Sequence, residues 1–393
     1  MAKVKITGHA SGTGILTVTA PNTSTDRTIT LPDATDTLIG AATTDALTTR
    51  INATGGRKNM IINGAMNVVQ RGTSSTGLGA TDGYYVADRF NIDFTNTAGR
   101  LTMTQDSDAP DGFGNSLKLD CTTADTSIAT DELCGLQYRF EGQDLQHLKK
   151  GTADAESITV SFYAKQNESR IISVALYDGD NSRMICQNVT VGTSWARHTI
   201  TFAGDTTGAF GDDNARSLDL WFYLHAGATY QGGALSTSWA SYSAGNRHAG
   251  IGSLFASTSN TFFLTGVQME LGSVATDYEH RSYGEELALC QRYYWKLAQD
   301  GVMQVGRTIS SNRVDAAFHF PVTMRASPTL NTSTITFGSM YHNGTAFVPS
   351  SPTPSGVHLS VHSMVVRFGC SETITANHAS SMQISIVELD SEL

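Results

Sequence analysis

Charge, cysteine, proline and long apolar runs are all scarce in this sequence. Charged residues make up 16% of its 393 residues and hydrophobic residues 40%, so a core can form beneath a largely neutral, polar surface. No apolar run approaches the ~20 residues that span a bilayer, and the chain begins without the apolar stretch of a signal peptide. We therefore expect a soluble protein that is made in a cytoplasm and is neither inserted in a membrane nor exported by the usual route.

Positive charge is also in short supply. The formal net charge is -10 and the isoelectric point is about 5.5. A protein that binds nucleic acid irrespective of sequence needs a cationic face, and so does one that binds anionic lipid. The composition therefore argues against both kinds of partner.

The five cysteines, at positions 121, 134, 186, 290 and 370, are odd in number and include no Cys-x-x-Cys pair. This spacing argues against zinc, and a chain of this length needs no disulfides to stabilise it. Cys121 and Cys134 could meet across a hairpin, although free buried thiols are the favoured interpretation. The sequence leaves their pairing open.

Common catalytic motifs are absent as well. The sequence contains no Gly-x-Ser-x-Gly, no His-Glu-x-x-His and no P-loop. A glycosidase needs two carboxylates about 5 to 9.5 Å apart. Glu270 and Glu279 lie near each other in the sequence, but they suit structural roles such as hydrogen bonding to Arg281 or to the amide of a turn. We therefore expect no enzymatic activity.

Alternation of apolar and polar residues is the pattern that the sequence has in abundance. Between positions 158 and 165, apolar residues occupy every even position, and the same pattern recurs at 172–176 and 218–224. Turn sequences such as Asp178-Gly179-Asp180-Asn181 separate these runs. Short alternating strands joined by turns are typical of two antiparallel sheets packed face to face. We therefore predict an all-β fold, with an antiparallel β-sandwich over residues 58–282.

The rest of the chain divides into a linking helix and a second β domain. Ser282 and Glu285 form a capping box, and apolar residues follow at spacings of three and four, which predicts a helix over residues 283–299. Val314, Ala316 and Phe318 then fall on one face of a long strand. Residues 300–393 are therefore predicted to form a smaller β-sandwich.

Residues 1–57 form a Thr-rich stretch with too little apolar surface for a core of its own. Two or three short strands are expected there, and isolated hairpins are marginal in water, so these strands would need partners from other chains. A flexible tail is the alternative. Residues 43–56 are predicted to be a linker.

Two segments that bracket the sandwich resemble a known module. Residues 59–71 read NMIINGAMNVVQR, residues 88–90 read DRF, and residues 263–282 read FLTGVQMELGSVATDYEHRS. In this order they resemble the opening and closing motifs of a β-sandwich module in bacteriophage tail fibre and tail-associated proteins. The CQRYY sequence at 290–294 and the segment at 318–328 are similar to the same family, and residues 28–40 resemble the intertwined N-terminal hairpins of phage fibres.

This resemblance implies a jelly-roll sandwich similar to carbohydrate-binding modules. It also implies a homotrimeric tail fibre that is assembled in the host cytoplasm, attaches to other virion proteins through residues 1–57 and recognises a glycan on the host surface. A head fibre, a spike or a capsid decoration protein would have the same fold. A polysaccharide depolymerase would usually show a long parallel β-helix repeat, which this sequence lacks.

The candidate glycan-binding residues lie in a Gly- and Ser-rich stretch at 226–250. Loops of this length are uncommon unless they are functional, aromatic rings stack on sugars, and Asn or Arg can hydrogen-bond to hydroxyls. The candidates are Tyr230, Trp239, Tyr242, Asn246 and Arg247. The alternative is that the rings only hold the loop against the sandwich. Trp221 and Tyr223 point outward in the strand pattern and are a second candidate, although packing against a neighbouring subunit is the favoured explanation there.

No cofactor is required by the sequence. Asp178, Asp180 and Asn181 offer clustered oxygen atoms that suit Ca2+, but they lack the spacing of an EF-hand. Ordinary turn chemistry explains the same residues and is the favoured interpretation.

Overall fold

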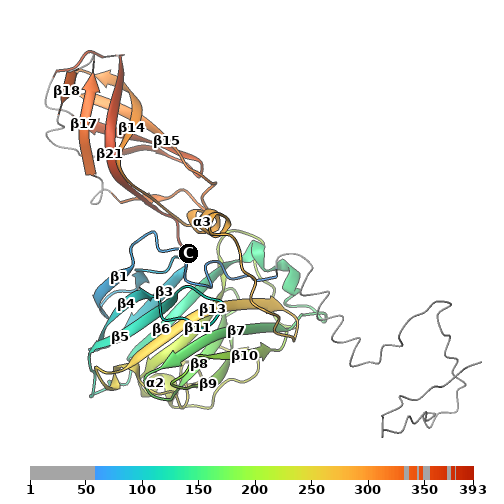
Figure 1. Ribbon diagram of the computed structural model, residues 1–393. Helices are drawn as coiled ribbons and strands as arrows, with labels where there is room; N and C mark the ends of the chain where they lie inside the picture. The colour runs from blue at the N-terminus through green and yellow to red at the C-terminus, as the bar shows by residue number, and fades with distance from the viewer. Residues whose placement is uncertain (1–57, 332–335, 343–344, 348–354, 370–372, 377) are drawn as a thin grey trace, which may run out of the picture. The chain divides into compact units, whose positions relative to one another are not determined.

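The computed structural model describes residues 58–331, 336–342, 345–347, 355–369, 373–376 and 378–393 (Figure 1). The hairpins and linker predicted within residues 1–57 lie outside the described residues. The chain divides into two compact units, Met1–Arg50 and Ile51–Leu393, and everything described below belongs to the second unit. No helix in these described ranges is long and apolar enough to cross a membrane.

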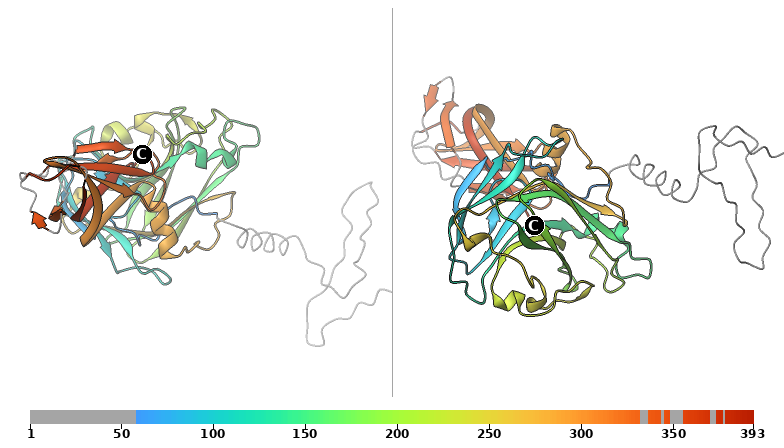
Figure 2. Two further views of the ribbon diagram at one scale, coloured as in Figure 1. Left: turned by 90° about the horizontal axis from the view of Figure 1, so that it is seen from above. Right: turned by 60° about the horizontal axis from the view of Figure 1, so that its bottom comes forward.

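Two antiparallel sheets form the sandwich that the sequence predicted (Figures 1 and 2). The first sheet has six strands in the order β1 (Ser74–Leu78), β4 (Arg100–Asp106), β5 (Ser116–Thr123), β13 (Thr261–Leu271), β7 (Ile158–Gln166) and β10 (Ala196–Phe202). The second has seven strands in the order β12 (Ala240–Ser241), β9 (Arg183–Val191), β8 (Arg170–Asp178), β11 (Arg216–Ala226), β6 (Leu133–Glu141), β3 (Phe90–Thr95) and β2 (Gly83–Tyr84).

Short helical segments interrupt the connections between these strands. They are η1 (Gly142–Asp144), η2 (Gln146–Leu148), α2 (Ala228–Gln231), η3 (Ala244–Asn246) and η4 (Leu254–Ala256). Three of them, α2, η3 and η4, lie in the connection from β11 to β13, residues 227–260, which we call the covering loop.

The core lies between the two sheets and follows the alternation in the sequence. Val160 and Phe162 of β7 and Leu220 and Phe222 of β11 are all fully buried in one cluster. The rings of Phe162 and Phe222 meet edge to face with their centroids 5.0 Å apart. Burial of whole apolar faces at roughly 25 cal/mol per Å² provides most of the stability of such a sandwich. The predicted antiparallel sandwich is therefore confirmed.

The opening and closing segments of the sandwich bind each other directly. The backbone amides of Lys58 and Asn59 both donate to the Glu279 carboxylate, each at 2.8 Å. The Arg281 guanidinium donates to the backbone carbonyl of Ile61 at 2.9 Å and to that of Asn59. We call this set of contacts the clasp. It joins residues more than 200 positions apart, so the motifs that carry the family resemblance have structural roles.

Two further motif residues also have structural partners. Glu270 accepts from the Thr276 backbone amide at 3.1 Å, as predicted for a turn. Asp88 accepts from the backbone amide and the side chain of Gln70, at 3.1 and 2.5 Å. Burial raises the pKa of Asp88 to about 7, against the opposing effects of Arg71 and Gln70.

Helix α3 (Tyr283–Gln291) begins as predicted, with the Ser282 hydroxyl accepting from the Glu285 amide at 3.3 Å. The prediction that the helix continues to residue 299 is wrong. Strand β14 (Tyr294–Ser310) begins three residues after the helix, and Tyr294 and Leu297 pair with Asp390 and Val387. A run of bulky aromatic residues at 293–295 favours the strand, and pairing with β21 (Ala379–Asp390) outweighs the helical spacing.

The second, smaller β domain is present as predicted. Its described strands all belong to one sheet, whereas the predicted sandwich would have two sheets. The order is β18 (Thr345–Phe347), β17 (Thr336–His342), β21 (Ala379–Asp390), β14, β15 (Arg313–His319), β20 (Ser363–Gly369) and β19 (Ser355–Leu359), and β16 (Thr329–Leu330) pairs with β21. As the alternation predicted, Val314, Ala316 and Phe318 are buried in its core.

The clasp generates a prediction about stability. Glu279→Gln removes the negative charge that accepts two backbone amides, and hydrogen bonds to charged groups contribute about 1.5–3 kcal/mol. We expect the free energy of unfolding, measured by urea titration, to fall by about 2 kcal/mol. Glu168→Gln, at a side chain that is 73% exposed, is the matched control and should change it little. Equal stability of both variants would contradict a role for the clasp.

Candidate functional site

The outer face of the seven-stranded sheet carries two rows of side chains that run across its strands. One row passes through Asn91, Gln137, Trp221, Ala175 and Cys186. The neighbouring row passes through Asp93, Gly135, Tyr223, Ser173 and Asn188. Because side chains of a strand alternate between faces, both rows point away from the core.

Trp221 and Tyr223 form an aromatic floor in the middle of these rows. Their rings are stacked, with centroids 4.8 Å apart and an interplanar angle of 9°. Gly135 makes room for them, because a Cβ atom there would lie 2.9 Å from the Tyr223 ring. Trp221 is only 5% exposed and Tyr223 only 1%. The prediction that this pair packs on a neighbouring subunit is therefore wrong, because the covering loop of the same chain buries it.

The covering loop is held to the sheet by hydrogen bonds along its length. The Cys186 amide donates to the Ser236 carbonyl at 2.7 Å, and the Ser173 hydroxyl donates to the Arg247 carbonyl at 3.0 Å. The Gly252 amide donates to the Ile171 carbonyl at 2.9 Å. Residues that the sequence marks as an unstructured stretch are thus fixed in place over β8 and β9.

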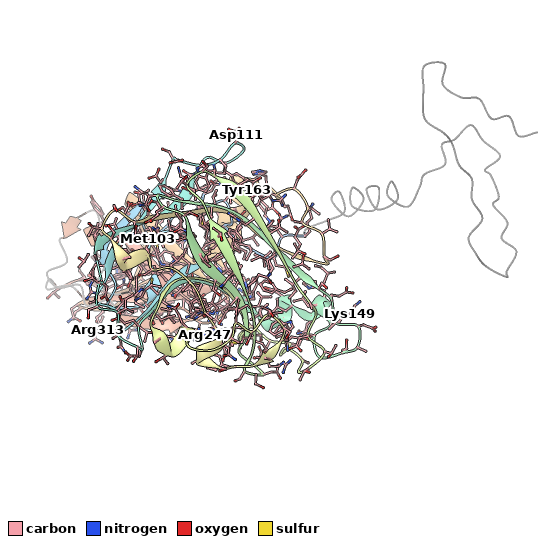
Figure 3. All side chains as sticks on the ribbon, turned by 90° about the horizontal axis from the view of Figure 1, so that it is seen from below. Met103, Asp111, Lys149, Tyr163, Arg247 and Arg313 are labelled. Carbon is pink, nitrogen blue, oxygen red and sulfur yellow. The ribbon has the colours of Figure 1, made fainter. Side chains whose placement is uncertain are left out.

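Arg247 is the centre of the site (Figure 3, seen from below, with Arg247 labelled). Its guanidinium donates to the Tyr242 hydroxyl at 2.9 Å and to the Tyr223 hydroxyl. It also lies 5.0–6.0 Å from the ring centroids of Trp221, Tyr223, Tyr230 and Tyr242. Burial opposes the charged form, but the two accepting tyrosines hold the pKa of Arg247 above its ordinary value. One cation therefore fixes four rings around it.

Beside Arg247 lies a hollow of about 260 Å³. Aromatic rings and charged groups line it, namely Tyr177, Trp221, Tyr230, Tyr242, Asp93, Arg216 and Arg247. Tyr242 is 41% exposed and meets Tyr177 edge to face with the ring centroids 5.6 Å apart. The hollow therefore presents an accessible ring at its rim and a buried ring at its floor.

Several buried polar atoms in the sheet row of Trp221 have no hydrogen-bond partner among the described residues. They are Trp221 Nε1, Gln137 Nε2 and Asn91 Oδ1, which belong to a single row of the sheet. A buried donor or acceptor without a partner costs about 1–3 kcal/mol, so such atoms are rare in native proteins. Trp221 is the one of these three residues that lines the hollow, and its Nε1 atom is itself buried.

The two carboxylates near the hollow differ in their partners. Asp219 is held by Arg216, whose Nε donates to it at 2.7 Å, so both charges are compensated. Asp93 has no ion pair or hydrogen bond to another described side chain. Burial, together with the nearby charge of Asp82, raises the pKa of Asp93 to about 6, although Arg139, Arg247 and Arg216 oppose this change. Asp93 is thus an acceptor that the fold leaves open.

Three of the five candidate residues meet at the hollow and two do not. Tyr230, Tyr242 and Arg247 line it. Trp239 instead donates its Nε1 to the Ala203 carbonyl at 2.7 Å and packs against the sandwich core. The backbone of Asn246 accepts from the Ser236 amide at 3.0 Å within the loop. Trp239 therefore holds the loop against the sandwich, which is the alternative that the sequence had left open for the rings, and Asn246 bonds within the loop.

The other residues of the hollow lie on strands. Asp93, Tyr177 and Arg216 were not predicted from the sequence, and Trp221 was a second candidate for which a subunit contact was the favoured explanation. Their outward positions in alternating strands are visible in the sequence, but the order of the strands in the sheet is not.

The calcium candidates are occupied by protein groups. The Asp178 carboxylate is 2.6 Å from the Lys150 ammonium and accepts from the Asn181 amide at 3.0 Å. Asp180 accepts from the Gly211 amide at 2.9 Å. A lysine therefore lies where a cation would bind, and the residues serve a turn. Cys121 and Cys134 are buried free thiols.

Comparisons with known proteins give similarity in structure only. No protein-family model matches the chain, and no curated protein matches its sequence. A structure titled "CBM4 structure and function" is 16% identical with a TM-score of 0.28, and the match covers 53% of this chain and 97% of that chain. A family 11 carbohydrate-binding module of a cellulosomal cellulase of Clostridium thermocellum is 13% identical with a TM-score of 0.26, covering 53% and 98%.

The C-terminal family 22 carbohydrate-binding module of Clostridium thermocellum Xyn10B is similar at 9% identity and a TM-score of 0.27, covering 52% of this chain and 98% of that one. TM-scores this low do not establish a shared fold. The fold of this chain is defined by its own strand pairing.

Arg247 generates a prediction about the covering loop. Arg247→Lys keeps the charge but cannot hold two tyrosine hydroxyls in fixed directions. We expect the free energy of unfolding to fall by about 2 kcal/mol and amide hydrogen exchange in residues 228–250 to accelerate. Arg313→Lys, at an exposed residue of the second domain, is the control. Unchanged exchange in the loop would show that Arg247 does not hold it.

Asp93 generates a prediction about pH. Its pKa in the folded protein, about 6, lies above the ordinary Asp value near 3.9, so the folded state binds this proton more tightly than the unfolded state. Its favourable contribution to stability is full below about pH 4 and is lost as the pH rises through about 6. Asp93→Asn should therefore stabilise the protein at pH 7.5 relative to wild type, with the difference shrinking toward pH 4. A difference that does not depend on pH would contradict this assignment.

Proposed function

We propose that the sandwich binds a carbohydrate in the hollow beside Arg247 and that it does so without catalysis. The observation that carries this proposal is the unpartnered Nε1 atom of Trp221 at the floor of an aromatic-lined hollow. Sugars combine apolar ring faces with many hydroxyl groups, so they suit a site that offers stacking rings beside hydrogen-bonding groups. Tyr242 would stack at the rim, Trp221 would donate, and Asp93 would accept.

Size and charge narrow the proposal further. The volume of about 260 Å³ lies below the 300–1,000 Å³ that is usual for pockets enclosing small molecules. A terminal or branching sugar therefore fits better than a long extended chain. Arg216 is compensated by Asp219, and the charge of Arg247 is balanced by Asp93 when that group is ionised. This balance favours a neutral sugar.

We further propose that the protein is part of a virion. The motif resemblance supports a homotrimeric phage tail fibre, with residues 1–57 attaching to other virion proteins and the hollow facing a host glycan. A head fibre or a capsid decoration protein would use the hollow in the same way. Single sugar sites are weak, since millimolar affinity corresponds to only about 4 kcal/mol. Several copies in one particle would strengthen attachment through avidity.

The absence of catalysis is supported by the roles of the motif carboxylates. Glu270 accepts from Thr276, and Glu279 accepts from two backbone amides of the clasp. Each is committed to a structural contact, so neither serves as an acid or a base. We expect no release of reducing ends when the protein is incubated with host capsule or lipopolysaccharide, as measured by a colorimetric assay. Release that disappears on Glu270→Gln would contradict the proposal.

The binding proposal is tested with a pair of matched tryptophan variants. Trp221→Phe keeps an aromatic floor but removes the unpartnered donor, whereas Trp239→Phe removes a donor already bonded to Ala203. On an array of host lipopolysaccharide and capsule oligosaccharides, Trp221→Phe should reduce affinity about tenfold, which corresponds to about 1.4 kcal/mol. Trp239→Phe should lower the melting temperature but leave affinity unchanged.

Two further variants complete that experiment. Tyr242→Ala should weaken binding with little loss of stability, because the ring is 41% exposed. Tyr283→Ala, at a ring that is 61% exposed outside the hollow, is its control. Equal binding by all four variants, each shown to be folded, would rule out the hollow as the glycan site.

The trimer is tested separately. Light scattering of the full chain at micromolar concentration should give three times the chain mass of 42.0 kDa. A monomer would contradict the fibre assignment and leave the glycan proposal standing, so the two failures are distinguishable.

A further inference from the structure

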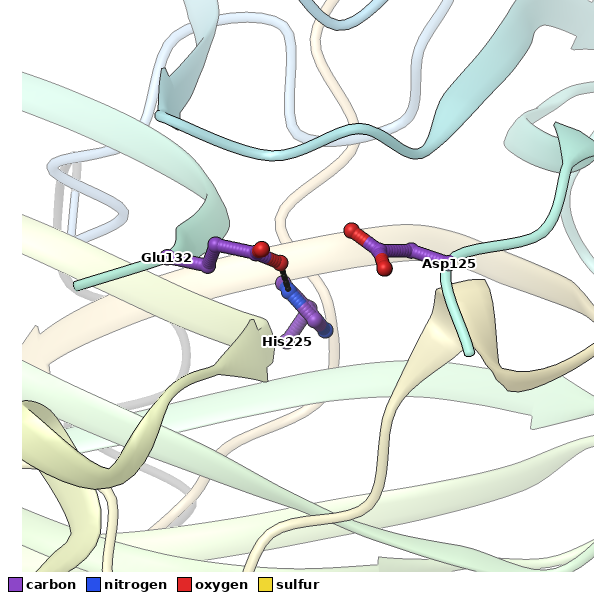
Figure 4. A group of neighbouring side chains, drawn as sticks. All are labelled: Asp125, Glu132 and His225. Atoms are coloured by element: carbon purple, nitrogen blue, oxygen red, sulfur yellow. Dashed lines mark hydrogen bonds and ion pairs between the residues drawn. The ribbon is translucent and has the colours of Figure 1, made fainter. Parts of the chain in front are cut away.

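Asp125, Glu132 and His225 form a buried cluster at one end of the sandwich (Figure 4). Asp125 lies in the connection from β5 to β6, Glu132 directly precedes β6, and His225 lies near the end of β11. Their exposed fractions are 4%, 3% and 0%. Asp125 extends from the six-stranded sheet and the other two from the seven-stranded sheet, so the cluster bridges both layers.

A β-bulge places the histidine. Tyr223 pairs with Gly135, but His225 pairs with Cys134, so one extra residue stands between two adjacent partners. The bulge shifts the alternation of β11, and the His225 ring meets the core ring of Phe255 with the centroids 5.2 Å apart. Asp125 is fixed beside it, because its amide donates to the Phe255 carbonyl at 2.8 Å.

The geometry of the cluster suits a metal ion. One nitrogen and two carboxylate oxygens all lie within 4.8 Å of one another. Ligand atoms that share a cation at about 2.1 Å in a tetrahedral arrangement are about 3.4 Å apart, so binding needs the most distant pair to close by up to about 1.4 Å. Figure 4 shows the Asp125 carboxylate facing the pair formed by Glu132 and His225.

Both ring nitrogens of His225 have partners that fix the orientation of the ring. His225 Nε2 is 3.0 Å from Glu132, and Nδ1 is 2.8 Å from the Ser253 hydroxyl. The Ser253 hydroxyl accepts from the Phe255 amide at 3.1 Å, which fixes its position. Metal-binding histidines usually donate their other ring nitrogen to such an oxygen, because this contact sets the tautomer and the orientation of the ring. Nε2 is then the nitrogen that faces the carboxylates.

The charges of the two buried carboxylates are a second observation that favours a bound cation. Two buried carboxylates face each other here, and no lysine or arginine in the described part of the chain forms an ion pair with either. Other buried carboxylates have such partners, as Asp178 has in Lys150 and Glu141 has in Arg292. Backbone amides compensate the two facing carboxylates in part, because Asp125 accepts from Ala98 and Ser127 at 3.1 and 3.2 Å and Glu132 accepts from Ala129 at 2.8 Å. A cation between the two carboxylates would relieve the repulsion that remains.

We propose that Asp125, Glu132 and His225 bind one divalent transition-metal ion of the zinc or manganese class. A donor set of one imidazole and two carboxylates suits these ions, whereas Ca2+ and Mg2+ prefer oxygen atoms alone. His225 stands just before the covering loop and Ser253 lies within its last part. The ion would therefore fix both ends of the covering loop. Metal binding at this cluster does not depend on which ligand the hollow binds.

The test uses the full chain. The protein is stripped with a chelator, desalted, and incubated separately with ZnCl2, MnCl2, CaCl2 or MgCl2. Metal retained after a second desalting is measured by mass spectrometry of the elements, and thermal melting is recorded. We expect one zinc or manganese ion per chain, a melting temperature several degrees higher in the loaded form, and no retained calcium or magnesium.

Matched variants separate this site from adsorption to other histidines. His225→Gln and Asp125→Asn keep the size of each side chain and should abolish retention. His198→Gln, at a half-buried histidine on β10, should retain one ion per chain. Equal retention in all three variants, or none in the wild type, would overturn the proposal.

A measurement on the wild type keeps the proposal testable if the variants fail to fold. Crystals soaked in ZnCl2 should give an anomalous difference peak at the zinc edge within about 2.5 Å of His225 Nε2. A peak elsewhere, or no peak at saturating zinc, would show that the cluster is only a hydrogen-bonded network.

Discussion

The sandwich depends on the clasp, in which backbone amides at the start of the described chain bind the carboxylate of Glu279 more than 200 residues later. Two sheets built from sequentially distant strands must bring those strands together against the entropy of long loops. A charged acceptor for two amides, reinforced by Arg281 on the carbonyls of Asn59 and Ile61, fixes the first and last segments of the sandwich to each other. The residues that make the sequence recognisable are therefore those that close the fold, and they say little about its ligand.

Closing the sandwich in this way leaves the outer face of the seven-stranded sheet to the covering loop. Arg247 holds that loop down, because its guanidinium binds two tyrosine hydroxyls and lies among four rings. The arrangement is costly, since it keeps Asp93 partly buried without a partner and leaves Trp221 Nε1 unsatisfied. Asp93 and Trp221 both line the hollow and both weaken the folded state. Residues that lower stability in this way are typical of binding sites, where function offsets the cost.

Alternation in the sequence was sufficient to predict the antiparallel sandwich and its core, as the burial of Val160, Phe162 and Phe222 shows. It also predicted the start of α3 from Ser282. Other features depend on contacts that no local pattern contains. The helix stops at Gln291 because the next residues pair with β21, and Trp221 is buried because the covering loop returns over it. The Gly- and Ser-rich composition and the aromatic residues of the covering loop suggested five candidates, and three of them line the hollow. The other residues of the hollow, such as Asp93 and Tyr177, lie on strands that are distant in the sequence. No local pattern in the sequence shows that these strands are neighbours in the sheet.

In the proposed site, Trp221 Nε1 donates to the sugar, and the four tryptophans make this contact directly measurable. Each indole N–H gives one resonance in a nitrogen-edited spectrum of the labelled protein. Titration with host oligosaccharide should move the Trp221 resonance in proportion to binding, while that of Trp239, already bonded to Ala203, stays in place. Binding that shifts the indole resonances of other tryptophans, with Trp221 unmoved, would contradict the account.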